Sequence, residues 1–191
     1  MEHISTVLKK LMTDTNQTTA GDYESETAAS GGLAHCLLSN DSGLFGECYR
    51  EVRGQYRRVP PGADPSKGCR IDFVVSPSLK LMEMGWRLGP IFIEVKRSNT
   101  KIGKVIVQCI DYRNAVFEVA PGFWVEPQWI FIFPLSHPAG DIASVMAHNC
   151  VGNAEVSPWQ GLKLMAGSQN VLIEKDEHTS HPPCGRKLGS R

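Results

Sequence analysis

Residues 90–96 read PIFIEVK, an apolar run in which two charged residues, Glu94 and Lys96, stand at alternate positions. The Ile, Phe and Val residues around them are typical of a strand. Because successive side chains on a strand point to opposite faces, Glu94 and Lys96 share one face of the sheet. The stretch therefore predicts a strand that presents a carboxylate and an amine side by side.

Residues 69–76, CRIDFVVS, form a second strand-like run with one acidic residue, Asp72, inside it. If the two strands pair, Asp72, Glu94 and Lys96 converge at one place in the sheet. Two carboxylates at the end of a sheet make an oxygen-rich site suited to Mg²⁺ or Mn²⁺. These three residues alone are equally compatible with an exposed strand end that carries a Lys–Glu pair.

The rest of the chain predicts helices and further strands around these two runs. Residues 79–89 connect the runs and could extend both into a hairpin. A helix, three strands, a helix and a strand follow one another, which predicts an α/β fold with a central mixed β-sheet flanked by helices. The further expected elements are helices over Tyr23–Leu38, Val105–Val119 and Asp141–Cys150, and strands over Cys48–Val59, Gln128–Phe133 and Asn170–Glu174.

The length of 191 residues fits one compact domain. We expect an N-terminal helix and linker over 1–21, the domain itself over 22–177 and a poorly ordered tail over 178–191. No apolar run approaches the roughly 18–20 residues of a membrane-spanning helix. The N-terminus also lacks the apolar core of a secretory signal. The expected location is therefore cytoplasmic, inside the host cell if the source is a phage.

The helix expected after PIFIEVK carries Gln108 and Tyr112, which are one turn apart and share a face. Asp72, the Glu94-Val95-Lys96 strand and this Q-x-x-x-Y pair, in that order, resemble the PD-(D/E)xK nuclease superfamily, in particular its RecB and λ-exonuclease-like branches. The resemblance implies a restriction-endonuclease-like αβββαβ core. Two features depart from the family pattern: Ile71 rather than proline precedes Asp72, and the connection from Asp72 to Glu94 is long.

The resemblance implies a role for each of these strand residues. Asp72 and Glu94 would hold the metal ion, and the Val95 carbonyl would add a ligand. Lys96 would orient or help to deprotonate the attacking water and stabilise negative charge on the phosphate. The implied chemistry is metal-assisted hydrolysis of a phosphodiester.

The superfamily also places a glutamate of its first helix near the metal, and both Glu24 and Glu26 are available here. At about 100° per residue, Glu26 falls within ~20° of the inward-facing Leu33 and Leu37, whereas Glu24 lies opposite. Glu26 is therefore the expected fourth metal ligand, and Glu47 is a weaker alternative. The candidate catalytic residues are Asp72, Glu94, Lys96, Glu26, Gln108 and Tyr112.

Lys and Arg total 20 and Asp and Glu total 20, so the formal net charge is zero. This balance excludes a uniformly basic binder and means that any contact with nucleic acid depends on a local patch. Trp124 and Trp129 are expected in the core or its wall rather than as a platform for bases. The candidate patch residues are Arg53, Arg57, Arg97, Lys101 and Lys104.

These expectations together describe a Mg²⁺-dependent deoxyribonuclease in which Mn²⁺ would substitute and DNA is the partner. Two symmetric copies would allow both strands to be cut, which makes a homodimer a candidate assembly. The alternative is a non-catalytic nucleic-acid-binding module that retains the nuclease fold. The two carboxylates favour the enzyme, because a binder gains nothing from groups that repel phosphate.

Overall fold

The centre of the molecule is a nine-stranded mixed sheet with the strand order β5-β4-β1-β2-β3-β6-β7-β8-β9. The computed structural model describes residues 23, 25–39, 42–64, 66–97, 100–136, 138–157, 160–167 and 169–174. The expected N-terminal helix and linker over 1–21 and the tail over 178–191 lie outside the described residues. The strands are β1 (Phe45–Tyr56), β2 (Cys69–Pro77), β3 (Ile91–Val95), β4 (Ala115–Ala120), β5 (Phe123–Val125), β6 (Ile130–Phe133), β7 (Val151–Ser157), β8 (Gly161–Ala166) and β9 (Gln169–Ile173).

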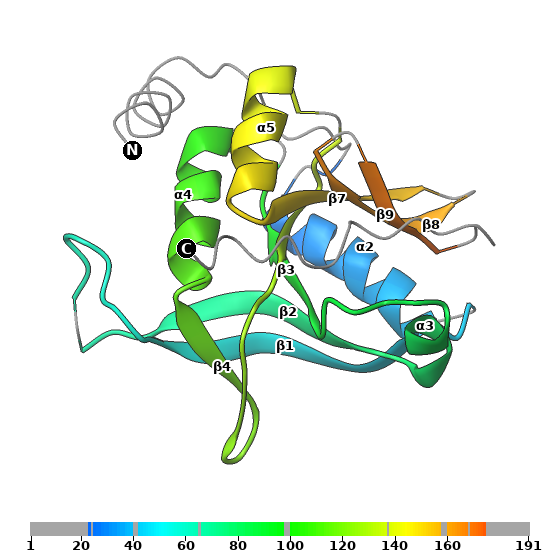
Figure 1. Ribbon diagram of the computed structural model, residues 1–191, viewed down its shortest axis with the longest axis horizontal. Coiled ribbons are helices and arrows are strands. Elements are labelled where there is room, and N and C mark those ends of the chain that lie inside the picture. Colours follow the sequence, from blue (N-terminus) through cyan, green and yellow to red (C-terminus); the bar gives the residue numbers. More distant parts are fainter. Residues whose placement is uncertain are drawn as a thin grey trace, which may run out of the picture.

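Helices cover both faces of this sheet (Figure 1). One face packs on α2 and α3 through residues such as Phe73 and Ile93. The other packs on α4 and α5 through their strand neighbours Val74 and Phe92, as the two-residue period of a strand requires. The expected α/β fold with a mixed sheet flanked by helices is confirmed. The helices described are α2 (Glu26–Ser39), α3 (Leu79–Glu83), α4 (Ile102–Tyr112) and α5 (Gly140–His148).

The strand pairings explain why the sheet is mixed. β1 with β2 and β2 with β3 are antiparallel neighbours, with Phe73 opposite Ile93. β3 and β6 are parallel, and so are β6 and β7. The chain must therefore cross over between β3 and β6, and it does so through α4 and the β4–β5 hairpin. That crossover puts α4 beside the charged end of β3.

Two expectations about the local structure were wrong. The helix expected over Val105–Val119 ends at Tyr112, and Ala115–Ala120 forms β4 instead. Ala115 and Phe117 are buried at alternate positions, and β4 pairs with β1, so tertiary pairing overrides the helical pattern. Residues 79–89 contain α3 rather than a hairpin extension, because the Ser78 hydroxyl caps its first turn by accepting from the Leu81 amide.

The sheet also extends further than the sequence predicts. β5, β7 and β8 were not expected, whereas the expected last strand is present as β9. β7 contains Gly152, at which a Cβ would lie 2.5 Å from the Phe131 ring and 2.6 Å from the Met165 carbonyl. Close packing of neighbouring strands thus requires a residue with low strand propensity.

Candidate active site

The two strand carboxylates meet where β2 and β3 pair. Asp72 and Glu94 lie one position beyond the Phe73–Ile93 pair and therefore face each other across the two strands on the α4 side of the sheet. Asp72 Oδ2 accepts a hydrogen bond of 2.7 Å from the Val95 amide. This bond fixes Asp72 against the strand that carries Glu94.

The side chain of Glu94 is almost fully buried, with 2% of the residue exposed. Its Oε1 accepts from Lys96 Nζ at 2.6 Å and from Gln108 Nε2 at 2.8 Å. Its Oε2 is buried and has no hydrogen-bond partner among the described residues. One carboxylate oxygen is therefore held in place while the other lacks the donor or cation that a buried charge requires.

The pKa values of Asp72, Glu94 and Lys96 are all raised from their ordinary values. Burial, together with the nearby charge of Asp72, raises the pKa of Glu94 from 4.5 to about 7. Burial likewise raises the pKa of Asp72, against the Val95 amide and Lys96, which lower it. The pKa of Lys96 is raised because its carboxylate neighbours, Glu94 foremost, outweigh the opposing effect of burial. Both carboxyl groups are therefore harder to ionise than exposed ones.

Gln108 and Tyr112 share the face of α4 that looks onto Glu94, as their spacing predicts. Gln108 Nε2 donates both to Glu94 Oε1 and, at 2.6 Å, to the Tyr112 hydroxyl oxygen. Tyr112 is buried against Phe117, and burial raises the pKa of its hydroxyl. The Q-x-x-x-Y pair therefore joins the helix to the carboxylate site through neutral hydrogen bonds.

A pocket of about 510 Å³ opens beside the site. Lys96 and Gln108 line it from the sheet and α4, and Glu26 lines it from the first turn of α2. Glu26 Oε1 lies 3.9 Å from Lys96 Nζ, and 53% of its side chain is exposed. The helix begins at Glu26, so this residue lies at the solvent end of the face that also carries Leu33 and Leu37. Glu24 lies outside the described residues, and Glu47 is exposed and bonds Tyr49.

Of the expected metal ligands, the structure brings Asp72 and Glu94 together. Among the described residues, no three His, Cys, Asp or Glu side chains form a group that could hold a metal ion. Glu26 approaches Lys96, and it does not join Asp72 and Glu94 in a three-carboxylate cluster. The paired carboxylates and the partnerless Glu94 Oε2 nevertheless fit a divalent cation, because such an ion would offset their mutual repulsion.

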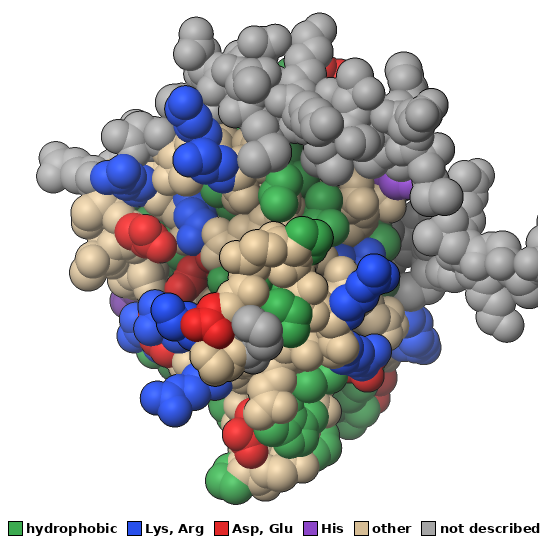
Figure 2. Space-filling view, turned by 90° about the vertical axis from the view of Figure 1, so that its left-hand side faces the viewer, with side chains coloured by type: hydrophobic (Ala, Val, Ile, Leu, Met, Phe, Trp, Pro, Cys, Tyr) green, Lys and Arg blue, Asp and Glu red, His purple; other side chains and the backbone are tan. Residues whose placement is uncertain are grey.

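The expected basic residues divide between two places. Arg97 and Lys104 line the 510 Å³ pocket, and Lys101 is exposed at the N-terminus of α4. Arg53 lines a separate pocket, and Arg57 is paired with Glu126 on the surface. Figure 2 shows Lys and Arg side chains in separate groups at the left and right of one face, with Asp and Glu side chains among them. The structure does not bring the five expected basic residues into one pocket.

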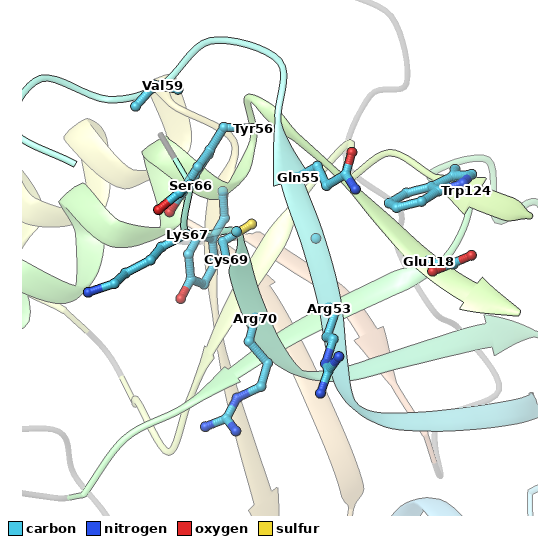
Figure 3. Close-up of a pocket in the computed structure, with 13 residues that line it drawn as sticks. Arg53, Gln55, Tyr56, Val59, Ser66, Lys67, Cys69, Arg70, Glu118 and Trp124 are labelled. Carbon is cyan, nitrogen blue, oxygen red and sulfur yellow. The ribbon is translucent and has the colours of Figure 1, made fainter. Parts of the chain in front are cut away.

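The sequence interpretation missed some of the residues around the site. Ser25 and Thr100 line the 510 Å³ pocket, but isolated hydroxyl residues in loops carry no distinctive pattern. Trp124 was expected in the core or its wall; it is 39% exposed and lines the second pocket (Figure 3). Trp129 is packed against the core and stacked on Phe131, as expected.

Comparisons of this chain with protein-family models, with curated proteins and with solved structures found no significant match. In the described part of the chain, no helix is both long and apolar enough to cross a bilayer.

Proposed function

We propose that this protein is a divalent-metal-dependent nuclease that hydrolyses phosphodiester bonds, with DNA as its substrate. The observation that carries the proposal is the Asp72–Glu94 pair. Its buried Glu94 Oε2 lacks a partner among the described residues, while Lys96 lies 2.6 Å from the other oxygen. A purely structural role would favour a buried carboxylate with donors on both oxygens.

The order of the elements supports the resemblance to PD-(D/E)xK nucleases. α2, β1, β2, β3, α4 and β6 follow one another along the chain, with the β4–β5 hairpin inserted before β6. We propose that these elements are the restriction-endonuclease-like αβββαβ core. The acidic residues on β2 and β3 and the Q-x-x-x-Y pair on α4 then occupy the positions that the resemblance implies.

In this proposal Asp72, Glu94 and the Val95 carbonyl hold Mg²⁺, or Mn²⁺ in its place. A bound ion would polarise a phosphoryl oxygen and lower the pKa of a coordinated water. Lys96 keeps its proton beside the carboxylates, so it acts as a fixed cation that orients water and stabilises charge on the phosphate. Glu26 lies across the pocket from Lys96 and helps to hold that amine in place.

Gln108 and Tyr112 position these groups without adding charge. The Gln108 amide donates to Glu94 Oε1 and holds it in place. The same amide nitrogen donates to the Tyr112 hydroxyl oxygen. Arg97 and Lys104 on the pocket wall attract the phosphate backbone. The proposed metal site at Asp72 and Glu94 thus lies beside a pocket whose walls carry Lys96, Arg97 and Lys104.

The test is cleavage of labelled linear and circular DNA, single- and double-stranded, with Mg²⁺, Mn²⁺ or EDTA. We expect products with either metal and none with EDTA. Glu94→Gln identifies contaminating nuclease, because it removes the central carboxylate, and Glu83→Gln on the exposed side of α3 is the matched control. Binding without cleavage under every condition would overturn the proposal in favour of a non-catalytic nucleic-acid-binding module.

A further inference from the structure

A second pocket, of about 840 Å³, lies next to the carboxylate site and takes no part in the chemistry described so far. It is bounded by the end of the β1–β2 hairpin and by the β4–β5 hairpin, which projects from the lower edge of the molecule in Figure 1. Its volume is within the usual range for sites that bind small organic molecules. Figure 3 shows the side chains that line it.

The first feature of this pocket is a pair of arginines. Arg53 on β1 and Arg70 on β2 are direct partners in the strand register, and their side chains extend in the same direction (Figure 3). Arg70 forms an ion pair with Glu51 at 2.6 Å, whereas Arg53 makes no ion pair within the described part of the chain. Like charges directly opposite each other on a sheet are unfavourable unless an anion lies between them. The arrangement favours a bound phosphate.

The second feature is an exposed aromatic ring. Trp124 on β5 lines the pocket with 39% of its surface exposed, and its indole reaches toward Gln55 (Figure 3). Its neighbour Phe123 is 61% exposed but does not line the pocket, because alternate side chains on a strand point to opposite sides. Trp124, its strand partner Glu118 and Arg53 all line the pocket, so an aromatic ring and a cation are available in one place for a base and its phosphate.

The pocket is also physically joined to the carboxylate site. Tyr112 forms part of its wall, and the Tyr112 hydroxyl oxygen accepts from Gln108 at 2.6 Å. Gln108 in turn donates to Glu94 at 2.8 Å. Two hydrogen bonds therefore separate the wall of this pocket from the buried carboxylate.

We propose that this pocket binds one unpaired nucleotide of a single-stranded substrate, with its base stacked on Trp124 and its phosphate held by Arg53. The proposal rests on the proposed nuclease function and names the substrate class as single-stranded nucleic acid. A base inside a duplex has both faces covered by its neighbours, so it cannot offer a face to Trp124. Stacking on this residue therefore selects unpaired strands.

The test is the affinity of fluorescein-labelled 12-mers, measured by anisotropy in EDTA so that no metal-dependent cleavage occurs. The probes are single-stranded DNA, single-stranded RNA and blunt duplex DNA of the same sequence. The variants are Trp124→Ala, Trp124→Phe and Arg53→Gln. The matched controls are Phe123→Ala on the same hairpin and Arg58→Gln, which is exposed and lines neither pocket.

We expect the wild-type protein to bind a single strand more tightly than the duplex, and Trp124→Ala to weaken single-strand binding by about 10-fold or more. Trp124→Phe should recover most of the affinity, and Arg53→Gln should weaken binding and flatten its salt dependence. The controls should remain within about two-fold of the wild type. Comparing the DNA and RNA arms identifies which single strand is preferred.

The inference is overturned if the duplex binds as tightly as the single strand, or if Phe123→Ala and Trp124→Ala lose affinity equally. If Trp124→Ala fails to fold, Arg53→Gln and Trp124→Phe provide the test. Wild-type affinity of Arg53→Gln for the single strand would then exclude binding in this pocket. Failure of the nuclease proposal looks different: single strands then bind through Trp124 but are not cut with Mg²⁺ or Mn²⁺. If metal-dependent cleavage occurs and Trp124→Ala changes neither cleavage nor single-strand binding, the nuclease proposal is supported and the nucleotide-pocket proposal is wrong.

Discussion

Two buried glutamates in this protein have opposite surroundings. Glu174, which follows β9, is 7% exposed, and both of its oxygens accept hydrogen bonds. Oε2 accepts from the Leu162 amide at 2.8 Å and Oε1 from the Ser42 hydroxyl at 3.0 Å. Glu94 is 2% exposed, yet Lys96 and Gln108 both donate to Oε1, while Oε2 has no hydrogen-bond partner among the described residues.

The difference separates a buried acid with structural hydrogen bonds, Glu174, from the one in the candidate site, Glu94. Glu174 ties β8 to the segment before β1, and its donors come from backbone and hydroxyl groups that the fold holds in place. Glu94 faces a second carboxylate, Asp72, across paired strands, and its Oε2 has no hydrogen-bond partner among the described residues. A buried carboxylate oxygen without a hydrogen-bond partner lowers the stability of the fold. Such destabilising groups are frequent at functional sites.

The largest expected effect is on catalysis. Asp72→Asn or Glu94→Gln should each lower the metal-dependent cleavage rate by at least about 1000-fold, because each removes a proposed metal ligand and its charge. The thermal midpoint of Glu94→Gln should stay at or above that of the wild type, since the substitution removes a poorly solvated charge. Near-normal cleavage by either folded variant would show that the pair is not the catalytic centre.

Glu174→Ala should lower the stability of the fold and leave the cleavage rate unchanged. It leaves the buried Leu162 amide and the Ser42 hydroxyl without their acceptor, which should cost roughly 2–3 kcal/mol of unfolding free energy. For a chain of this length that lowers the thermal midpoint by roughly 5–10 °C. Cleavage per folded molecule should be unchanged, and Glu126→Ala, which breaks an exposed ion pair, is the control with little effect on either quantity.

Gln108→Ala should slow cleavage by about 10-fold or somewhat more, because Glu94 Oε1 loses the amide that positions it. Tyr112→Phe removes only a hydroxyl and should have a smaller effect. The measurements are the cleavage rate and the thermal midpoint of each variant. If the midpoint falls while the rate per folded molecule is preserved, this face of α4 serves packing rather than function.

The pH dependence of stability should reveal the unsatisfied charge. The pKa of Glu94 is raised in the folded state from 4.5 to about 7, so its neutral form favours folding and that contribution is lost as pH rises across this window. We expect the unfolding free energy in EDTA to fall by about 1–3 kcal/mol between pH 5 and pH 8 relative to Glu94→Gln. Mn²⁺ should raise the thermal midpoint more at pH 8 than at pH 5. An equal shift at both pH values would argue against a metal ion at Glu94.

The smallest effect is expected at Glu26. Glu26→Gln should lower the cleavage rate several-fold, because a partner of Lys96 across the pocket is weakened while both strand carboxylates remain. Glu47→Gln, in the position left open by the sequence, should have no effect, since Glu47 bonds Tyr49 on the surface. A larger loss at Glu47 than at Glu26 would show that the wrong glutamate has been assigned to the site.

The candidate site was easier to predict than the boundaries of the fold. Glu94 and Lys96 share a face because strand side chains alternate, and Gln108 and Tyr112 share one because four residues make about one helical turn. Both expectations are confirmed by the hydrogen bonds among these four residues. Such spacing rules act within one element and need no knowledge of its neighbours.

Trp124 and β4 illustrate what local patterns miss. Residues 115–119 fit a helix in isolation, but pairing of Phe117 with Gly54 makes them a strand. The same strand carries the β4–β5 hairpin, in which Trp124 pairs with Glu118 and is 39% exposed. The strand propensity of a segment depends on its neighbours, which lie far away in the sequence.

The sequence by itself determined the strand and helix faces that carry Asp72, Glu94, Lys96, Gln108 and Tyr112, because those depend on the fixed periods of strand and helix. Only the tertiary structure decided that Asp72 stands opposite Glu94, that Glu26 approaches Lys96 rather than the carboxylates, and that Arg53 and Trp124 share a pocket. Register and packing decide these relations, since they depend on contacts between segments that are distant in the chain.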